Sequence, residues 1–154
     1  MLSRRTLLKA GAASAAGLAL SPLWAASEKD AAMAMRTIPS SGEAIPVIGM
    51  GSSGSFEVGI SDQERDPLRE VLRRFFAGGG RLIDTAPSYG SAETVIGDLL
   101  SELGLREKTF LATKISSTGR EAGKAQFENS LRRLKTDKVE LLQVHNMQDW
   151  QTQM

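Results

Sequence analysis

The sequence predicts an α/β fold in which parallel strands alternate with helices. From residue 35 onward, short apolar stretches recur about every 30 residues, each followed by a stretch with helical spacing of its apolar residues. Strands that alternate with helices of about 10 to 15 residues are typical of βαβ units, which form parallel sheets. The strand and helix periods therefore predict the class of fold before any single residue is considered.

The elements follow one another regularly along the chain. We expect a first strand within residues 44–51, leading into a Gly/Ser loop, and later strands at 81–84, 109–114 and 139–145. Asp66 and Pro67 indicate the N-cap and first residue of a helix over 66–77, which Gly78 to Gly80 end. Its apolar side comprises Leu68, Val71, Leu72, Phe75 and Phe76. Two further helices are expected at 91–103, ending at Gly104, and at 121–134, ending near Thr136 and Asp137.

The number of units suggests a partial barrel. Four units occupy residues 36–154, whereas a closed eight-stranded α/β barrel takes about 250 residues. The sequence thus predicts about the first four βα units of a TIM barrel, in a chain that is truncated or a gene fragment. The alternative is a complete doubly wound domain of the flavodoxin type, which requires a fifth strand that the pattern lacks.

Composition limits the classes of function. The chain has 154 residues, of which 41% are hydrophobic and 24% charged, and its formal net charge is +1. These values fit a soluble globular protein, and the low net charge gives no indication of nucleic-acid binding. The chain has no cysteine and a single histidine, His145. We therefore expect no disulfide, no thiol nucleophile and no metal site.

The first 26 residues have the pattern of an export signal. "SRRTLLK" precedes an uncharged Ala/Gly/Leu stretch and small residues near Ala25 to Ser27. The pair Arg4 and Arg5 resembles the twin-arginine motif, which implies contact with the export machinery and a periplasmic or exported product. Cleavage is expected near Ala26 or Ala34, with 27–35 as a linker. An uncleaved signal that tethers the chain to the membrane, or a disordered tail, is the alternative.

Three polar residues occupy corresponding places in successive units. Asp84, Lys114 and His145 each close an apolar strand, and Tyr89, the only tyrosine, follows Asp84 on the next loop. A single charged residue at a strand end is usually only solvated. Three in register predict a shared site, because the carboxyl edge of a parallel sheet is where ligands bind.

The chemistry that these four residues could share is proton transfer beside a carbonyl group. A tyrosine is a reluctant acid near neutral pH, but a neighbouring ammonium favours the phenolate. A carboxylate can hold that ammonium in place, and a histidine can orient the reacting oxygen through a hydrogen bond.

Four motifs in this order resemble the aldo-keto reductases. They are "IDTAPSYG", "GSAETVIG", "LATK" and "SLRRLKTDKVELLQVH", and the resemblance covers residues 36–150. It implies a general acid (Tyr89), a lysine that favours its ionisation (Lys114), an aspartate paired with that lysine (Asp84), and a histidine that orients the substrate carbonyl (His145). It also implies hydride delivery by a nicotinamide cofactor, normally NADPH, to an aldehyde or ketone.

The resemblance also places further groups. It puts Gly51, Ser52 and Asp84 near the nicotinamide end of NADPH, and Trp150 on the substrate rim. "MRTIPSSGE" with "AIPVIGMGS" is similar to a hairpin that closes the bottom of the barrel in the family. Most of the cofactor site, including the phosphate-binding loops, lies in the family's second barrel half, which follows the region matched here.

The sequence is consistent with three hypotheses about function. The first is the N-terminal half of an exported aldo-keto reductase. The second is a catalytically inactive half-barrel that self-associates or pairs with another half, because an open sheet edge and apolar surface invite association. The third is another barrel enzyme that uses the Asp/Lys/His edge for lyase or isomerase chemistry. The sequence indicates neither the substrate nor the oligomeric state.

Overall fold

The computed structural model describes residues 32–147 and 150–153, so the expected signal peptide at 1–26 lies outside the described residues. Within the described part, no helix is long and apolar enough to cross a membrane.

The described part begins with a two-stranded antiparallel hairpin. Strand β1 (Met35–Thr37) pairs with β2 (Ala44–Pro46), and Met35 lies opposite Pro46. The hairpin expected from the resemblance is confirmed. The single strand expected over 44–51 is wrong, because it divides into β2 and β3 (Gly49–Gly51), which belong to separate sheets. An ion pair of 3.2 Å between Arg81 and Glu43 joins the hairpin to the main sheet.

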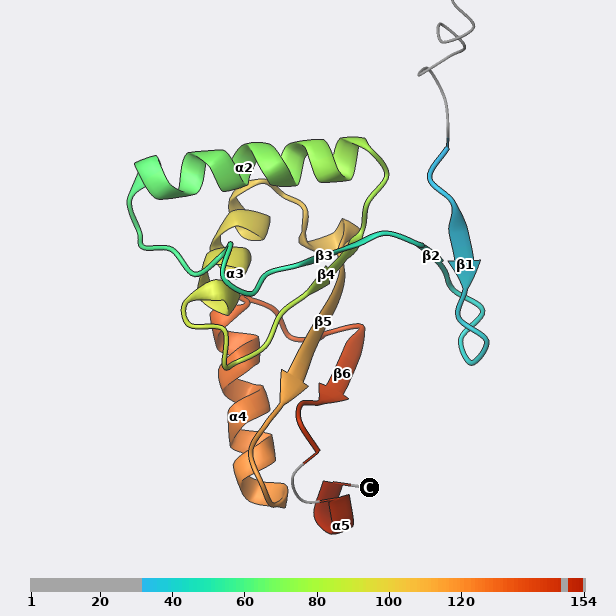
Figure 1. Cartoon of the computed structure of the whole chain (residues 1–154), viewed down its shortest axis with the longest axis vertical. Helices are drawn as coiled ribbons and strands as arrows, with labels where there is room; N and C mark the ends of the chain where they lie inside the picture. The colour runs from blue at the N-terminus through green and yellow to red at the C-terminus, as the bar shows by residue number, and fades with distance from the viewer. Residues whose placement is uncertain (1–31, 148–149, 154) are drawn as a thin grey trace, which may run out of the picture. The chain divides into compact units, whose positions relative to one another are not determined.

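The main sheet has four parallel strands in the order β3-β4-β5-β6. After β3 come β4 (Leu82–Asp84), β5 (Phe110–Ile115) and β6 (Leu141–Val144), each beside its predecessor in the chain. Because parallel crossovers are right-handed, an order that never reverses places all connecting helices on one face. This is the winding of a barrel, and it excludes the flavodoxin-like alternative, whose strand order reverses. Figure 1 shows the three long helices on one side of the sheet.

These helices are α2 (Asp62–Ala77), α3 (Ala92–Glu102) and α4 (Arg120–Arg133). A 3₁₀ turn, η1 (Arg106–Lys108), precedes β5, and a short helix, α5 (Trp150–Gln153), follows β6. The boundaries of α3 and α4 agree with the sequence prediction within about two residues, the usual uncertainty at helix ends. At its C-terminal end, α4 stops at Arg133, and Lys135, with a φ of 52°, begins the turn that was expected around Thr136 and Asp137.

The start of α2 differs from the prediction. The helix begins at Asp62, with Ser61 as N-cap, so Pro67 lies inside it and Asp66 is not the N-cap. The Ser61 hydroxyl donates to the Glu64 carboxylate at 2.6 Å, which also accepts a hydrogen bond from the Gly59 amide. These bonds fix the first turn upstream of the proline. Pro67 removes only one helical hydrogen bond near an exposed end, where its cost is small. Val71, expected on the apolar side, is 45% exposed.

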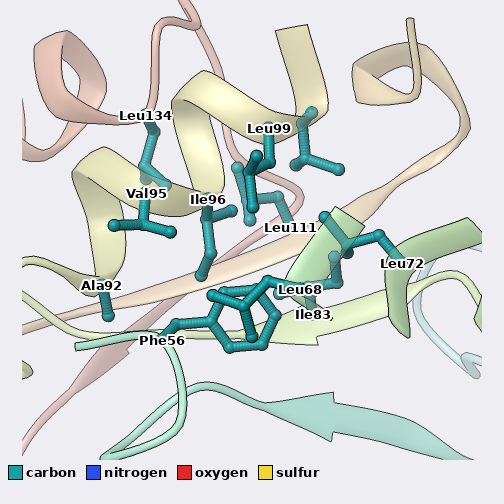
Figure 2. Close-up of a cluster of buried hydrophobic side chains, with 11 residues drawn as sticks. Phe56, Leu68, Leu72, Ile83, Ala92, Val95, Ile96, Leu99, Leu111 and Leu134 are labelled. Carbon is teal, nitrogen blue, oxygen red and sulfur yellow. The ribbon is translucent and has the colours of Figure 1, made fainter. Parts of the chain in front are cut away.

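The core lies between α2, α3 and the central strands β4 and β5. Leu72, Ile83, Ile96 and Leu111 are fully buried there, and Figure 2 shows them within a cluster of buried hydrophobic side chains. Side chains alternate between the two faces of a strand. Because Ile83 faces the helices, its neighbour Asp84 faces the opposite, helix-free side of the sheet.

The contact between α3 and α4 is unusually close at Gly97. A Cβ atom at this position would lie 2.3 Å from the Arg133 carbonyl oxygen and 2.7 Å from the Leu134 Cα. Beside it, the buried Glu93 carboxylate accepts hydrogen bonds from Arg133 and, at 2.6 Å, from the Thr113 hydroxyl. Glycine and this carboxylate together fix α3 against α4 and β5.

Candidate active site

An ion pair between β4 and β5 forms the centre of the candidate site. The Lys114 Nζ atom lies 2.6 Å from Asp84 Oδ2 and also donates to the Thr85 carbonyl at 2.8 Å. The Lys114 side chain is 11% exposed and that of Asp84 33% exposed. A nearly buried ammonium needs such partners, because an unpaired buried charge is costly. The lysine is therefore held in one orientation.

Strand register explains why these two residues meet. Asp84 lies opposite Ala112 in the parallel ladder, so Lys114 is two residues further along β5 and on the same face. Thr113 faces the helices, since its hydroxyl donates to Glu93, and Lys114 consequently faces the helix-free side. Lys114 does not close its strand as predicted, because β5 continues to Ile115.

Tyr89 lies on a tight loop between β4 and α3. The Tyr89 amide donates to the Ala86 carbonyl, and the Tyr89 carbonyl accepts from the Ala92 amide at 2.8 Å. Gly90 follows with a φ of 44°, a conformation that favours glycine. The loop is fixed further by the Ser91 hydroxyl, which donates to the Val58 carbonyl at 2.7 Å. The tyrosine ring is thus held at the carboxyl edge of the sheet, partly packed on the core.

The Lys114 ammonium and the Tyr89 ring are in cation–π range. The Nζ atom lies over the ring, 5.1 Å from its centroid. The lysine that pairs with Asp84 therefore also contacts the face of the Tyr89 ring.

His145 completes the cluster from the neighbouring strand. Its backbone amide donates to the Ile115 carbonyl at 2.7 Å, immediately after β6. The imidazole meets the Tyr89 ring edge to face, with centroids 5.7 Å apart and an interplanar angle of 87°. Its Nδ1 atom lies 3.4 Å from the Ser88 hydroxyl. The structure therefore brings together all four residues that the sequence predicted as catalytic.

The predicted cofactor contacts lie next to this cluster. Gly51 is exposed and pairs with Asp84 in the ladder, and a Cβ added at Gly51 would meet nothing within 4 Å. Ser52 is fully buried, and its hydroxyl has no hydrogen-bond partner among the described residues. These features leave backbone room for a ligand beside Asp84, whereas the Ser52 hydroxyl is not presented at the surface.

Trp150, predicted on the substrate rim, lies apart from this cluster in its contacts. Trp150 begins α5 and is 64% exposed. In the described part of the chain, no hydrogen bond or ring contact joins it to the four clustered residues. Residues 32–147 and 150–153 contain no group of histidine and acidic side chains arranged to hold a metal ion.

Two groups that contact the clustered residues were not predicted from the sequence. The Thr85 carbonyl is a backbone group, so no residue pattern could have identified it. Ser88, by contrast, stands directly before Tyr89 in the same loop, and the proximity of two polar side chains on one loop was an available signal.

Fold and site together define a parallel α/β barrel protein with a Tyr/Lys/Asp/His cluster at the carboxyl edge of its sheet. Residues 47–153 match the family model described as "Aldo/keto reductase family". The chain belongs to the aldo/keto reductase family.

Individual relatives agree with this assignment. The chain is 38% identical over 119 residues to methylglyoxal reductase YeaE of Escherichia coli, covering 73% of this chain and 40% of that protein. It is 40% identical over 88 residues to aldo-keto reductase YhdN of Bacillus subtilis, covering 49% and 27% of the respective chains. The chain therefore spans less than half the length of these curated relatives.

Solved structures show the same fold. A putative aldo-keto reductase from Pseudomonas aeruginosa matches with a TM-score of 0.65 and 30% identity, covering 75% of this chain and 47% of that one. An aldo-keto reductase from Klebsiella pneumoniae in complex with NADPH matches with a TM-score of 0.63 and 32% identity, covering 73% and 40%. The described sheet and helices thus correspond to an incomplete TIM barrel.

Proposed function

We propose that this chain supplies the proton-transfer apparatus of an NADPH-dependent reductase that converts an aldehyde or ketone to an alcohol. The observation that carries the proposal is the cluster itself, in which Asp84, Lys114, Tyr89 and His145 converge at one edge of the sheet. Family membership and a relative solved with NADPH support the choice of cofactor.

In this mechanism Tyr89 is the general acid. It donates its phenolic proton to the carbonyl oxygen, and the electron pair of the C=O bond moves to that oxygen. Lys114 stabilises the resulting phenolate, and Asp84 holds Lys114 in position at 2.6 Å. His145 donates a hydrogen bond to the carbonyl oxygen and orients it toward Tyr89. NADPH, when bound, supplies the hydride that the carbonyl carbon accepts.

The residues proposed to approach the cofactor are Gly51, Ser52 and Asp84. Gly51 leaves its backbone open at the site. One Asp84 oxygen binds Lys114, and the carboxylate remains 33% exposed, so it can accept a hydrogen bond from a sugar hydroxyl. Ser52 would contact the cofactor through its backbone, and its buried hydroxyl has no hydrogen-bond partner among the described residues. Trp150, which is 64% exposed, is proposed to contact substrate at the rim.

The test replaces the phenol oxygen alone. In the longest natural chain that contains these 154 residues, Tyr89→Phe is expected to lower NADPH-dependent carbonyl reduction at least about 100-fold. Methylglyoxal, the substrate in the name of the E. coli relative, is the first carbonyl to assay. NADPH affinity, measured by fluorescence titration, should change little because the ring remains. Retained turnover would remove Tyr89 from its role.

We also propose that the protein is exported. The support is the Arg4/Arg5 pattern with the uncharged stretch that follows it. A reductase exported by this route would cross the membrane already folded around its cofactor. Replacing both arginines by lysine should retain the protein in the cytoplasm of a host with a twin-arginine pathway, as measured by cell fractionation. Periplasmic recovery of that variant would argue against this route.

A second candidate is an inactive half-barrel that associates with another copy or another half. The observation in its favour is the edge strand β6, where Leu141, Leu142 and Val144 are about 40% exposed. Leu142 and Val144 also line a groove of about 300 Å³ with Phe127 of α4. This candidate predicts that residues 27–154 alone elute as concentration-dependent oligomers with no measurable NADPH binding. A monomer that binds NADPH tightly would contradict it.

A further inference from the structure

A serine lies beside the only histidine of the protein. Ser88 is exposed on the β4–α3 loop, directly before Tyr89, and its Oγ lies 3.4 Å from His145 Nδ1. This distance is at the long end of hydrogen bonding, as is common at catalytic sites before substrate binds. Within the described residues it is the one hydrogen bond that the imidazole ring makes.

The partner of Nδ1 decides which nitrogen carries the proton. A neutral imidazole has one N–H, and the other nitrogen is an acceptor. A carboxylate or carbonyl at Nδ1 can only accept, so it would hold the proton on Nδ1. A hydroxyl can donate or accept. When it donates, Nδ1 is the acceptor and Nε2 carries the proton. In the described part of the chain, no carboxylate or carbonyl bonds to the ring, and the serine hydroxyl is its partner.

Nε2 is the ring nitrogen with no hydrogen bond to any described residue. Ser88 occupies the Nδ1 side, and the Tyr89 ring meets the imidazole edge to face at 5.7 Å. The backbone of His145 is fixed by its hydrogen bond to Ile115. The remaining polar atom of the ring is therefore Nε2, which can donate a hydrogen bond only in the tautomer that has its proton on Nε2.

We infer that Ser88 is a positioning residue, whose hydroxyl donates to His145 Nδ1 and so places the imidazole proton on Nε2. The consequence for catalysis rests on the proposed function: an Nε2–H donor can hydrogen-bond a substrate carbonyl, whereas an unprotonated Nε2 would repel its lone pairs. The tautomer itself is a property of this chain and does not depend on turnover.

The experiment uses the fact that the chain has one histidine, so its imidazole gives a single set of resonances. In ¹⁵N-labelled protein at alkaline pH, where histidine is neutral, long-range ¹H–¹⁵N spectra distinguish the two tautomers. We expect the wild type to show a protonated Nε2 and a hydrogen-bonded, unprotonated Nδ1. Ser88→Ala should move both ¹⁵N resonances toward the averaged values of free imidazole. Ser88→Thr, which keeps the hydroxyl, should restore the wild-type pattern.

A matched control is Ser101→Ala, an exposed serine on α3 away from the site, which should leave the imidazole resonances unchanged. The inference is overturned if the wild type is protonated at Nδ1, or if Ser88→Ala leaves both nitrogen resonances in place. In the catalytically active form, Ser88→Ala should lower kcat/KM by about 3- to 10-fold, the equivalent of one ordinary hydrogen bond. Should no form reduce carbonyls, the proposed function fails while the NMR result still decides the role of Ser88.

Discussion

The central strands and the edge strand of the described sheet differ in how far their apolar residues are buried. On β4 and β5, Ile83 and Leu111 are fully buried beneath α2 and α3, whereas Leu141, Leu142 and Val144 of β6 remain about 40% exposed. The residue types are the same, so coverage rather than composition makes the difference. The site spans this boundary, since Asp84 and Lys114 extend from the covered strands and His145 follows the uncovered one.

This difference means that the clustered residues are held in place by different parts of the fold. The Asp84–Lys114 pair depends on the β4–β5 ladder, which the core stabilises from beneath. The position of His145 depends on β6, whose outer edge has no strand partner among the described residues. We expect changes in the covered half to affect the whole fold, and changes on β6 to affect mainly the histidine and association.

The largest effect should come from emptying the covered core. Leu111→Ala removes a fully buried side chain and should lower the free energy of unfolding by about 3 kcal/mol. The matched variant Leu142→Ala, at a position that is 41% exposed, should lower it by less than about 1 kcal/mol. Urea denaturation measures both values. An equal loss of unfolding free energy in the two variants would show that β5 and β6 do not differ in burial.

The next effect concerns the contact that fixes α3 against α4. In Gly97→Ala the new methyl group would lie 2.3 Å from the Arg133 carbonyl oxygen, so the helices must separate. We expect a loss of about 2 kcal/mol in the free energy of unfolding, as for other overpacked sites. Ser101→Ala on the same helix should stay within about 0.5 kcal/mol. A neutral Gly97→Ala would mean that the two helices can move apart at no cost.

An ion-pair network supports the same side of the molecule. Asp98 on α3 pairs with Arg65 of α2 at 2.8 Å and with Lys135, just after α4, at 2.7 Å. Burial raises the pKa of Asp98, but the hydrogen bonds from Lys135 and Arg65 outweigh it and hold that pKa below its ordinary value of 3.8. A lowered pKa means that the stabilisation is present above this value and is lost as the pH falls through the folded-state pKa.

The corresponding test compares Asp98→Asn with the wild type at two pH values. At neutral pH the variant should be less stable by about 1 kcal/mol, because the pairs are only partly buried. Below pH 3.8 the difference should shrink, since the wild-type carboxylate becomes protonated as the pH falls through its lowered folded-state pKa. Urea unfolding at both pH values measures this, and a difference that stays constant would contradict the assignment.

The smallest change in stability is expected on the uncovered strand. Leu142→Lys adds a charge at an exposed edge position and should alter the free energy of unfolding by no more than about 0.5 kcal/mol. If the exposed β6 surface mediates self-association, the same variant should lower the apparent mass in size-exclusion chromatography with light scattering. An unchanged mass would place any association elsewhere on the chain.

Much of this organisation could be predicted from the sequence, because it follows from periodicity. The spacing of apolar strands predicted the parallel sheet, and three polar strand ends predicted that Asp84, Lys114 and His145 would share an edge. The start of α2 differs from the Asp66–Pro67 prediction because the hydrogen bond between Ser61 and Glu64 begins the helix about one turn earlier. The division of residues 44–51 into two strands was missed because sheet membership depends on partners distant in sequence.

The strand order also has a consequence for how the site assembles during synthesis. Each strand of the main sheet after β3 pairs with the one made immediately before it, so every ladder closes a loop of modest length, at low entropic cost. The emerging polypeptide can add one βα unit at a time to a sheet that already exists. We expect Asp84 and Tyr89 to be placed first, Lys114 one unit later, and His145 with the fourth strand. Growth of the sheet and assembly of the Asp84, Lys114, Tyr89 and His145 cluster are therefore expected to follow the same order along the chain.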